Sequence, residues 1–208
     1  MKKDLIISAV IGVLGIVLLF FTTNGFTAFT LEQQRLQDLQ AQPPEFPDIE
    51  VVDHAGETFN FNDLEGRHIF MTFIYTSCAA ACPEMSSNMK VVYEKIDDKY
   101  FEEELIFLSV SFDTKRDTVE VLNRYAEYFK ADAESWKMLR VPDDQELETL
   151  LGTYGVTVIP EDDADFQHNT SFYILSPDGR LTEVLDFKEP DAAADILTKL
   201  LEEQEGTL

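Results

Sequence analysis

The chain has 208 residues and a formal net charge of −24, from 40 acidic and 16 basic side chains. This balance argues against a nucleic-acid partner, because phosphate binding needs clusters of Lys and Arg that the chain lacks. The acidic surface is expected to favour solubility and does not indicate a fold. After an apolar N-terminal segment, roughly 160 residues remain, which is enough for one domain with a hydrophobic core.

The N-terminal segment is predicted to cross a membrane. No charged side chain lies between Asp4 and Glu32, and residues 5–21 are strongly apolar. That length is close to the minimum for a membrane-spanning helix, and two lysines mark its cytoplasmic end. We therefore expect residues 1–30 to be an uncleaved membrane anchor. A cleaved signal peptide is the alternative, but no cleavage site of small residues follows the apolar run.

Residues 31–47 are predicted to be a linker. The segment is polar and rich in Gln, and it ends with three prolines at positions 43, 44 and 47. A helix can extend to Gln42, where the prolines would stop it. The globular domain is expected to cover residues 48–204.

Strands and helices alternate in the first half of this domain. Residues 67–75 and 105–111 are rich in β-branched and aromatic side chains, which predicts two strands. Between them, apolar residues recur at helical spacing and predict a helix over residues 83–100. A further helix is expected to begin at Asp117, where Glu120 completes a capping-box pattern. Leucines at positions 147, 150 and 151 indicate another helix.

The second half of the domain predicts a hairpin and a closing helix. Residues 171–175 and 180–187 are the predicted strands, and Pro177-Asp178-Gly179 between them has the composition of a tight turn. Pro190 is expected to open the last helix. This order of elements is typical of a thioredoxin-like α/β fold.

Both cysteines of the chain lie where the first strand meets the first helix. Cys78 and Cys82 are separated by three alanines. Two sulfurs at this spacing can bind one soft metal ion or form a local disulfide. Cys82 is expected at the helix N-cap, where the helix dipole would favour its thiolate. A purely stabilising disulfide is less favoured, because so short a loop restrains little chain entropy.

Three histidines could complete a metal site, since two thiolates leave copper under-coordinated and imidazole is a natural third ligand. Surface roles suffice for His54, in a polar turn, and for His68, at the start of a strand. His168 follows an acidic loop and precedes a strand, and in a thioredoxin-like fold that loop approaches the active-site turn. A lone loop histidine is more often a solvated side chain, so the residues alone leave both interpretations open.

The cysteine pair and the distant histidine occur in an order that resembles the SCO/SenC/PrrC copper proteins. The similarity covers roughly residues 46–201. The motifs that carry it are Tyr75-Thr76-Ser77-Cys78, Cys82-Pro83, Ser109-Val110-Ser111-Phe112-Asp113, Arg116-Asp117-Thr118, Tyr125, Asp165 through His168, Phe172-Tyr173-Ile174-Leu175 and Pro177-Asp178-Gly179.

The resemblance implies a thioredoxin-like copper-binding protein, anchored in a bacterial inner membrane or its mitochondrial counterpart. With the two lysines at the cytoplasmic end, we expect the inner (cytoplasmic) membrane, with the globular domain on the periplasmic side. Such proteins help to mature the copper centre of cytochrome c oxidase, either by transferring copper or by reducing the recipient cysteines. Carried over to this sequence, Cys78 and Cys82 would be the thiolate ligands and the redox pair, and His168 would supply the imidazole. The expected partners are an upstream copper donor and a copper-receiving oxidase subunit. Asp113 would tune the site without being a ligand.

Two departures from the family pattern concern this site. Ala79 and Thr114 stand where proline is common, and the run of three alanines is expected to alter copper affinity or redox potential. A metallochaperone is the leading interpretation. A thiol–disulfide oxidoreductase is the alternative and would not need His168. A peroxidase of thioredoxin-like fold is less favoured, because no Arg lies beside the cysteine motif in the sequence.

Overall fold

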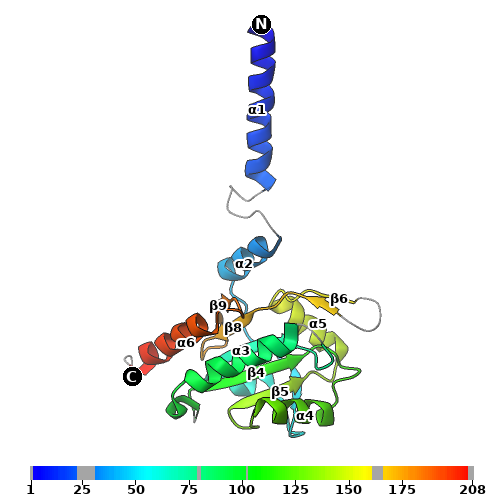
Figure 1. Ribbon diagram of the computed structural model, residues 1–208, viewed down its shortest axis with the longest axis vertical. Helices are drawn as coiled ribbons and strands as arrows, with labels where there is room; N and C mark the ends of the chain where they lie inside the picture. Colours follow the sequence, from blue (N-terminus) through cyan, green and yellow to red (C-terminus); the bar gives the residue numbers. More distant parts are fainter. Residues whose placement is uncertain (1, 23–30, 79–80, 102, 161–165, 206–208) are drawn as a thin grey trace. The chain divides into compact units, whose positions relative to one another are not determined.

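The computed structural model describes residues 2–22, 31–78, 81–101, 103–160 and 166–205. The chain divides into two units, residues 1–42 and 43–208. The first unit contains the helices α1 (Lys2–Thr22) and α2 (Leu31–Ala41) (Figure 1). Among the residues just given, no helix is both long and apolar enough to span a bilayer, so the anchor over residues 1–30 stays a prediction.

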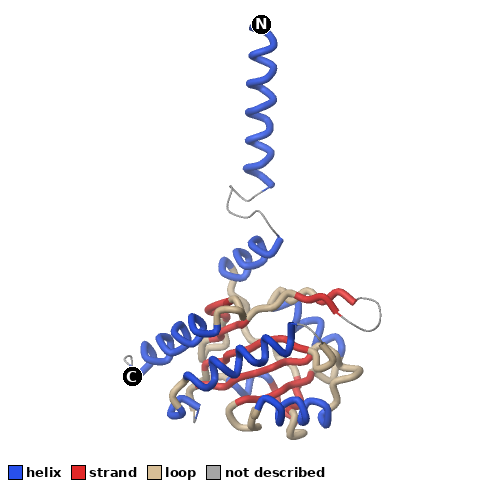
Figure 2. The backbone as a smooth tube through the Cα atoms, viewed as in Figure 1, coloured by secondary structure: helices blue, strands red, loops and turns tan. Residues whose placement is uncertain are grey.

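The second unit is built on a seven-stranded sheet with the order β2-β1-β5-β4-β3-β8-β9. Figure 2 shows its strands in red and the helices in blue. Its strands are β1 (Glu50–Asp53), β2 (Thr58–Asn60), β3 (His68–Ile74), β4 (Leu105–Ser111), β5 (Trp136–Arg140), β8 (Phe172–Leu175) and β9 (Leu181–Leu185). A separate two-stranded sheet pairs β6 (Val158–Pro160) with β7 (Phe166–His168). The helices are α3 (Ala81–Lys95), α4 (Val119–Phe129), α5 (Asp144–Thr153) and α6 (Pro190–Glu205), with short 3-10 helices η1 (Phe61–Leu64) and η2 (Asp98–Phe101).

The centre of the sheet has the topology of a thioredoxin-like fold. Strands β3, β4 and β5 run parallel, whereas β8 pairs antiparallel with β3 and β9 with β8. Helix α3 connects β3 to β4, and α6 closes the chain and packs against α3. Every residue of β3 and β4 is buried, as expected of strands covered on both faces. The predicted α/β architecture is therefore present, and the strand predicted over residues 105–111 coincides with β4.

Several predicted boundaries differ from the observed ones. The helix predicted over residues 83–100 ends at Lys95 in α3, and η2 forms a separate turn after it. Residues 43–47, predicted as linker, fall in the second unit. There the Leu181 N–H donates to the Pro44 carbonyl at 3.0 Å, and Phe46 packs edge-on against Phe61. These contacts explain why this proline-rich segment is part of the globular unit.

The two histidines expected at the surface are buried. His54 is 5% exposed and its Nδ1 accepts a hydrogen bond of 3.0 Å from the Met138 N–H, between the β1–β2 hairpin and β5. His68 is equally buried at the start of β3. Burial lowers the pKa of both side chains, which favours the neutral imidazole. The sequence did not indicate either burial. For His54 the reason is that β5, which supplies its hydrogen-bond donor, was not predicted.

Asp117 does not cap helix α4, contrary to the prediction. Thr118 is the N-cap residue, and its side chain accepts from the Val121 N–H. The fully buried carboxylate of Asp117 accepts instead from the Thr76 N–H at 3.0 Å, the Thr76 hydroxyl at 2.5 Å and the Ser111 hydroxyl at 2.5 Å. Because Thr76 follows β3 and Ser111 ends β4, this one carboxylate joins the ends of both central strands to the start of α4.

We expect replacement of Asp117 by Ala to lower the free energy of unfolding by about 2–4 kcal/mol, because it leaves three donors without their acceptor. Asp144→Ala is the control, since that exposed carboxylate accepts a single side-chain hydrogen bond, from Thr114. Its cost should stay below about 1 kcal/mol. Urea unfolding of both variants provides the measurement. Equal losses of stability in the two variants would contradict this role of Asp117.

Candidate metal centre

The two cysteines lie close together after the end of β3. Cys78 follows the strand through a short turn, and Cys82 lies in the first turn of α3. The Cys82 N–H donates to the Cys78 Sγ at 3.3 Å, and neither thiol is in a disulfide. Because α3 begins at Ala81, Cys82 is inside the helix and is not its N-cap. Ala79 and Ala80 lie outside the described residues, so the predicted effect of the alanine run stays a prediction.

The expectation of a stabilised Cys82 thiolate is wrong for the metal-free protein. Cys82 has no exposed surface, and this burial raises the pKa of its thiol well above the ordinary value. The neighbouring Cys78 and Asp117 act in the same direction, whereas a backbone hydrogen bond involving Tyr75 acts against them. The position at the helix start does not compensate for desolvation. The raised pKa favours the neutral thiol, so a metal ion bound here would have to displace the proton.

His168 approaches Cys82 from a different part of the fold. It is the last residue of β7, and its Nε2 lies 3.6 Å from the Cys82 Sγ, across 86 positions of sequence. Its Nδ1 is 3.1 Å from the carbonyl oxygen of Asn169. Since a carbonyl can only accept, Nδ1 carries the proton and Nε2 presents its lone pair toward the sulfur. Burial lowers the pKa of His168, which also favours the neutral form.

The three predicted ligands form two pairwise contacts. Cys82 contacts both Cys78 and His168, but across the described part of the chain no three His, Cys, Asp or Glu side chains converge as closely as a formed metal site requires. Two sulfurs and one imidazole nitrogen are donors that suit a soft ion such as copper. The three side chains would have to lie closer together before all of them could bind one ion, so this ligand set stays a prediction.

An aromatic cluster surrounds His168, and sequence reasoning missed it. We define it by Tyr75, Phe112 and Phe166. The ring centroids of Phe112 and Tyr75 lie 4.9 and 6.1 Å from that of His168. Tyr75 follows β3 and Phe112 follows β4, and adjacent parallel strands end at the same edge of a sheet. The aromatic residues that directly follow two predicted strands could therefore have indicated this cluster from the sequence.

Arg116 lies over this cluster, although no Arg was expected near the cysteine motif. Its guanidinium carbon is 5.3 Å from the Phe166 ring centroid and 5.8 Å from that of Tyr75. Its Nε forms an ion pair with the buried carboxylate of Asp113. Asp113 was predicted to tune the site from nearby, and this ion pair is a route by which it reaches the aromatic cluster. The sequence around Arg116 did not indicate that its guanidinium would lie over these rings.

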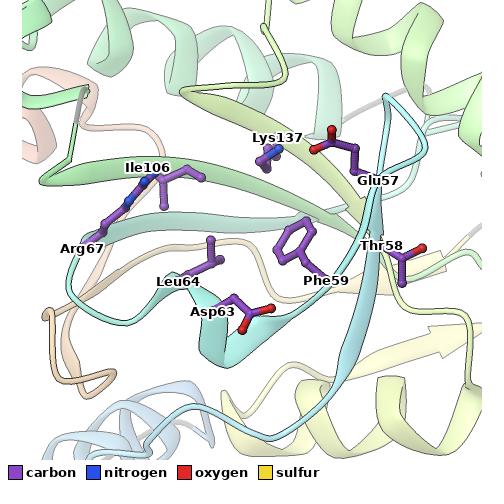
Figure 3. A pocket seen from close by; sticks show the side chains of 8 residues that line it. All are labelled: Glu57, Thr58, Phe59, Asp63, Leu64, Arg67, Ile106 and Lys137. Carbon is purple, nitrogen blue, oxygen red and sulfur yellow. The ribbon is translucent and has the colours of Figure 1, made fainter.

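A separate cavity of about 500 Å³ lies at the opposite edge of the sheet (Figure 3). Arg67 precedes β3, Ile106 lies near the start of β4 and Lys137 near the start of β5, whereas Cys78 follows the other end of β3. The Lys137 ammonium is occupied by Asp53, at 2.6 Å. The lining residues are Glu57, Thr58, Phe59, Asp63, Leu64, Arg67, Ile106 and Lys137. The cavity includes none of the three predicted ligands.

Comparison with known proteins identifies relatives that match about 70% of this chain. The SCO1 protein homolog of Bacillus subtilis is 25% identical over 145 residues, which cover 69% of this chain and 74% of that protein. The human mitochondrial SCO1 homolog is 28% identical over 160 residues, covering 72% of this chain. The chain spans about half the length of that human relative, 51%.

Solved structures show the same fold. Yeast Sco1 with copper bound superposes with a TM-score of 0.65 at 21% identity, covering 80% of this chain and 96% of that one. Copper-bound ScoI of Arabidopsis thaliana gives 0.66 at 19% identity, covering 76% and 98%. The family model described as SCO1/SenC matches residues 37–202. Because that match extends over most of the sequence, the chain belongs to the SCO1/SenC family.

Proposed function

We propose that this chain is a copper metallochaperone for assembly of the copper centre of cytochrome c oxidase. Solved relatives are described as copper-bound, and one is described as a member of a family of cytochrome c oxidase assembly proteins. The observation that carries the proposal is the 3.6 Å approach of the His168 Nε2 to the Cys82 Sγ. A thiol and a neutral imidazole from distant segments, with a second thiol beside them, are the donor types that copper prefers.

In this proposal Cys78, Cys82 and His168 are the copper ligands. Each cysteine loses its proton when copper binds, so the apparent affinity rises with pH. The hydrogen bond from the Cys82 N–H to the Cys78 Sγ, at 3.3 Å, is one that a thiolate would accept more strongly than a thiol. The hydrogen bond at Nδ1 of His168 keeps Nε2 directed at the site.

Copper would leave the site by ligand exchange with cysteines of the receiving oxidase subunit, after delivery by an upstream donor. The exposures of the two thiols differ, with 9% for Cys78 and none for Cys82. An incoming thiolate therefore reaches Cys78 first. Oxidation of the pair to a disulfide would remove both sulfur ligands and stop copper binding, which makes the redox state a gate for transfer.

A thiol–disulfide oxidoreductase is the second candidate. The proximity of the two cysteines favours it, because a dithiol so placed can close a disulfide while it reduces the cysteines of a partner protein. A disulfide switch is described for one solved relative of similar fold. Only the chaperone function needs His168, which makes that residue the point of discrimination.

We expect His168→Ala to weaken copper binding by at least about 100-fold, because loss of the imidazole leaves copper with two ligands. Anaerobic copper titration of the reduced protein, followed by spectroscopy that counts sulfur and nitrogen ligands, provides the measurement. Gln167→Ala is the matched control, because this neighbouring side chain on β7 is exposed. It should bind copper as the unaltered protein does.

Thiol exchange tested on the same variants separates the two candidates. A chaperone with His168→Ala should fail to support oxidase assembly in cells, although its cysteines still exchange with a model disulfide. If His168→Ala keeps copper stoichiometry and oxidase assembly, the chaperone proposal is wrong and the oxidoreductase is favoured. Substitution of either cysteine by Ser should abolish both activities.

We also propose that residues 1–30 anchor the chain in the inner membrane as a single-pass segment, with the globular unit on the periplasmic side. The support comes from the uncharged run between Asp4 and Glu32 and the two lysines before it. Apolar side chains along α1, such as Leu14 and Leu18, are exposed at 62% and 66%. Such a surface is stable in lipid and costly in water.

The full chain is expected to stay in the membrane pellet after alkaline carbonate washing, whereas a chain without residues 1–30 should be released to the soluble fraction. Removal of residues 31–42 instead is the control and should leave the protein in the pellet. Protease added to spheroplasts should digest the globular unit. Recovery of the full chain in the soluble fraction, or protection of the globular unit from protease, would contradict the proposed topology.

A further inference from the structure

We propose that Arg116 is a positioning residue for the metal centre, holding the β6–β7 hairpin so that His168 meets Cys82. This inference rests on the proposed copper function. His168 belongs to a two-stranded sheet that shares no strand pairing with the seven-stranded sheet in the described residues. Its distance from Cys82 is therefore set by side-chain packing together with residues 169–171, which connect β7 to β8 of the main sheet. Cys82 itself is positioned by β3 and α3.

The packing runs through Phe166. Phe166 and His168 are two positions apart on β7, so their side chains lie on the same face of the strand, and Gln167 between them is exposed. That shared face packs against Tyr75 and Phe112, the other two members of the aromatic cluster. The Phe166 ring contacts Tyr75 and Phe112 edge-on, with centroids 5.2 and 5.6 Å away. The Tyr75 hydroxyl also lies 3.4 Å from the Phe166 carbonyl oxygen.

Arg116 covers the outer side of this contact. Its guanidinium lies over both Phe166 and Tyr75, at 5.3 and 5.8 Å, so one cation interacts with a ring from the hairpin and a ring from the main domain. Its Nη2 is buried and has no hydrogen-bond partner among the described residues, as expected of a group that stacks on rings. The guanidinium thereby stabilises the contact between the two rings.

Asp113 keeps Arg116 in this place. The Asp113 carboxylate is 5% exposed and pairs with the Arg116 Nε. Its Oδ1 also accepts from the Arg116 backbone N–H at 3.3 Å. If the guanidinium left the rings, it would leave a buried carboxylate unpaired, which is costly. The ion pair thus fixes the cation, the cation fixes Phe166, and Phe166 fixes the strand that carries His168.

These contacts affect copper binding because a metal site tolerates only small displacements of its ligands. Ligands must be held within about 0.5 Å of a productive geometry to bind tightly. Two residues of strand separate Phe166 from His168 by about 7 Å, so a tilt or shift of the ring is transmitted directly to the imidazole. Arg116 acts on copper through this geometry, without being a ligand.

The test uses Arg116→Gln, Phe166→Leu and the double variant, with Arg124→Gln on the exposed side of α4 as the control. In the metal-free protein, amide hydrogen exchange at residues 166–168 should be about 10-fold faster in each single variant. Copper affinity should fall by about 10-fold in each. The double variant should lose no more than either single variant, because both remove one contact.

A further variant separates lost stacking from an unpaired buried charge. Asp113→Asn combined with Arg116→Gln removes both members of the ion pair and should still show fast exchange and weak copper binding. The proposal would be overturned if this variant exchanged its amides and bound copper as the unaltered protein does. It would also be overturned if amide exchange were unchanged in Arg116→Gln, or if the losses of copper affinity multiplied in the Arg116→Gln, Phe166→Leu double variant. The exchange measurement needs no copper, so it judges this inference even if His168→Ala shows the copper proposal to be wrong.

Discussion

The contact between the Cys82 Sγ and the His168 Nε2 is the interaction on which the site depends, and the two sides of it are held differently. Cys82 is fixed by its place between a central strand and the first turn of α3. His168 is carried by a hairpin outside the main sheet, and aromatic packing holds that hairpin. Any property that needs all three predicted ligands is therefore sensitive to residues that touch no ligand atom.

The site lies at the edge where the parallel strands end. The ends of β3 and β4 supply Tyr75 and Phe112 to the aromatic cluster, and the Asp117 carboxylate ties the same two ends together. In open α/β sheets, functional groups gather at the carboxyl ends of the strands, because the loops that follow them converge there. The cavity at the opposite edge is lined by none of the predicted ligands.

The central strands, the cysteine pair and the closing hairpin and helix could be predicted, because their patterns are local. The strand β5 could not, because its apolar and basic residues alternate too briefly, and without β5 the burial of His54 had no explanation. Asp117 was misassigned for a similar reason, since a carboxylate before a helix caps it by default unless distant hydroxyls bind it more tightly. The raised pKa of Cys82 follows from burial that only the folded chain creates.

Copper binding would need buried ligands, whereas copper release would need a ligand that can move. In this fold the two properties belong to different segments. Cys82, a proposed copper ligand, is fully buried, which would shield a bound ion from water and would also hinder direct approach by a partner's cysteine. The main sheet cannot open without breaking strand pairing on both sides of β3. Among the described residues the β6–β7 hairpin shares no such pairing, so movement of His168 away from Cys82 breaks side-chain contacts, including those of Phe166 with Tyr75 and Arg116, and no pairing with the main sheet. In the proposed chaperone, departure of His168 would expose copper to exchange while both cysteines still bind the ion.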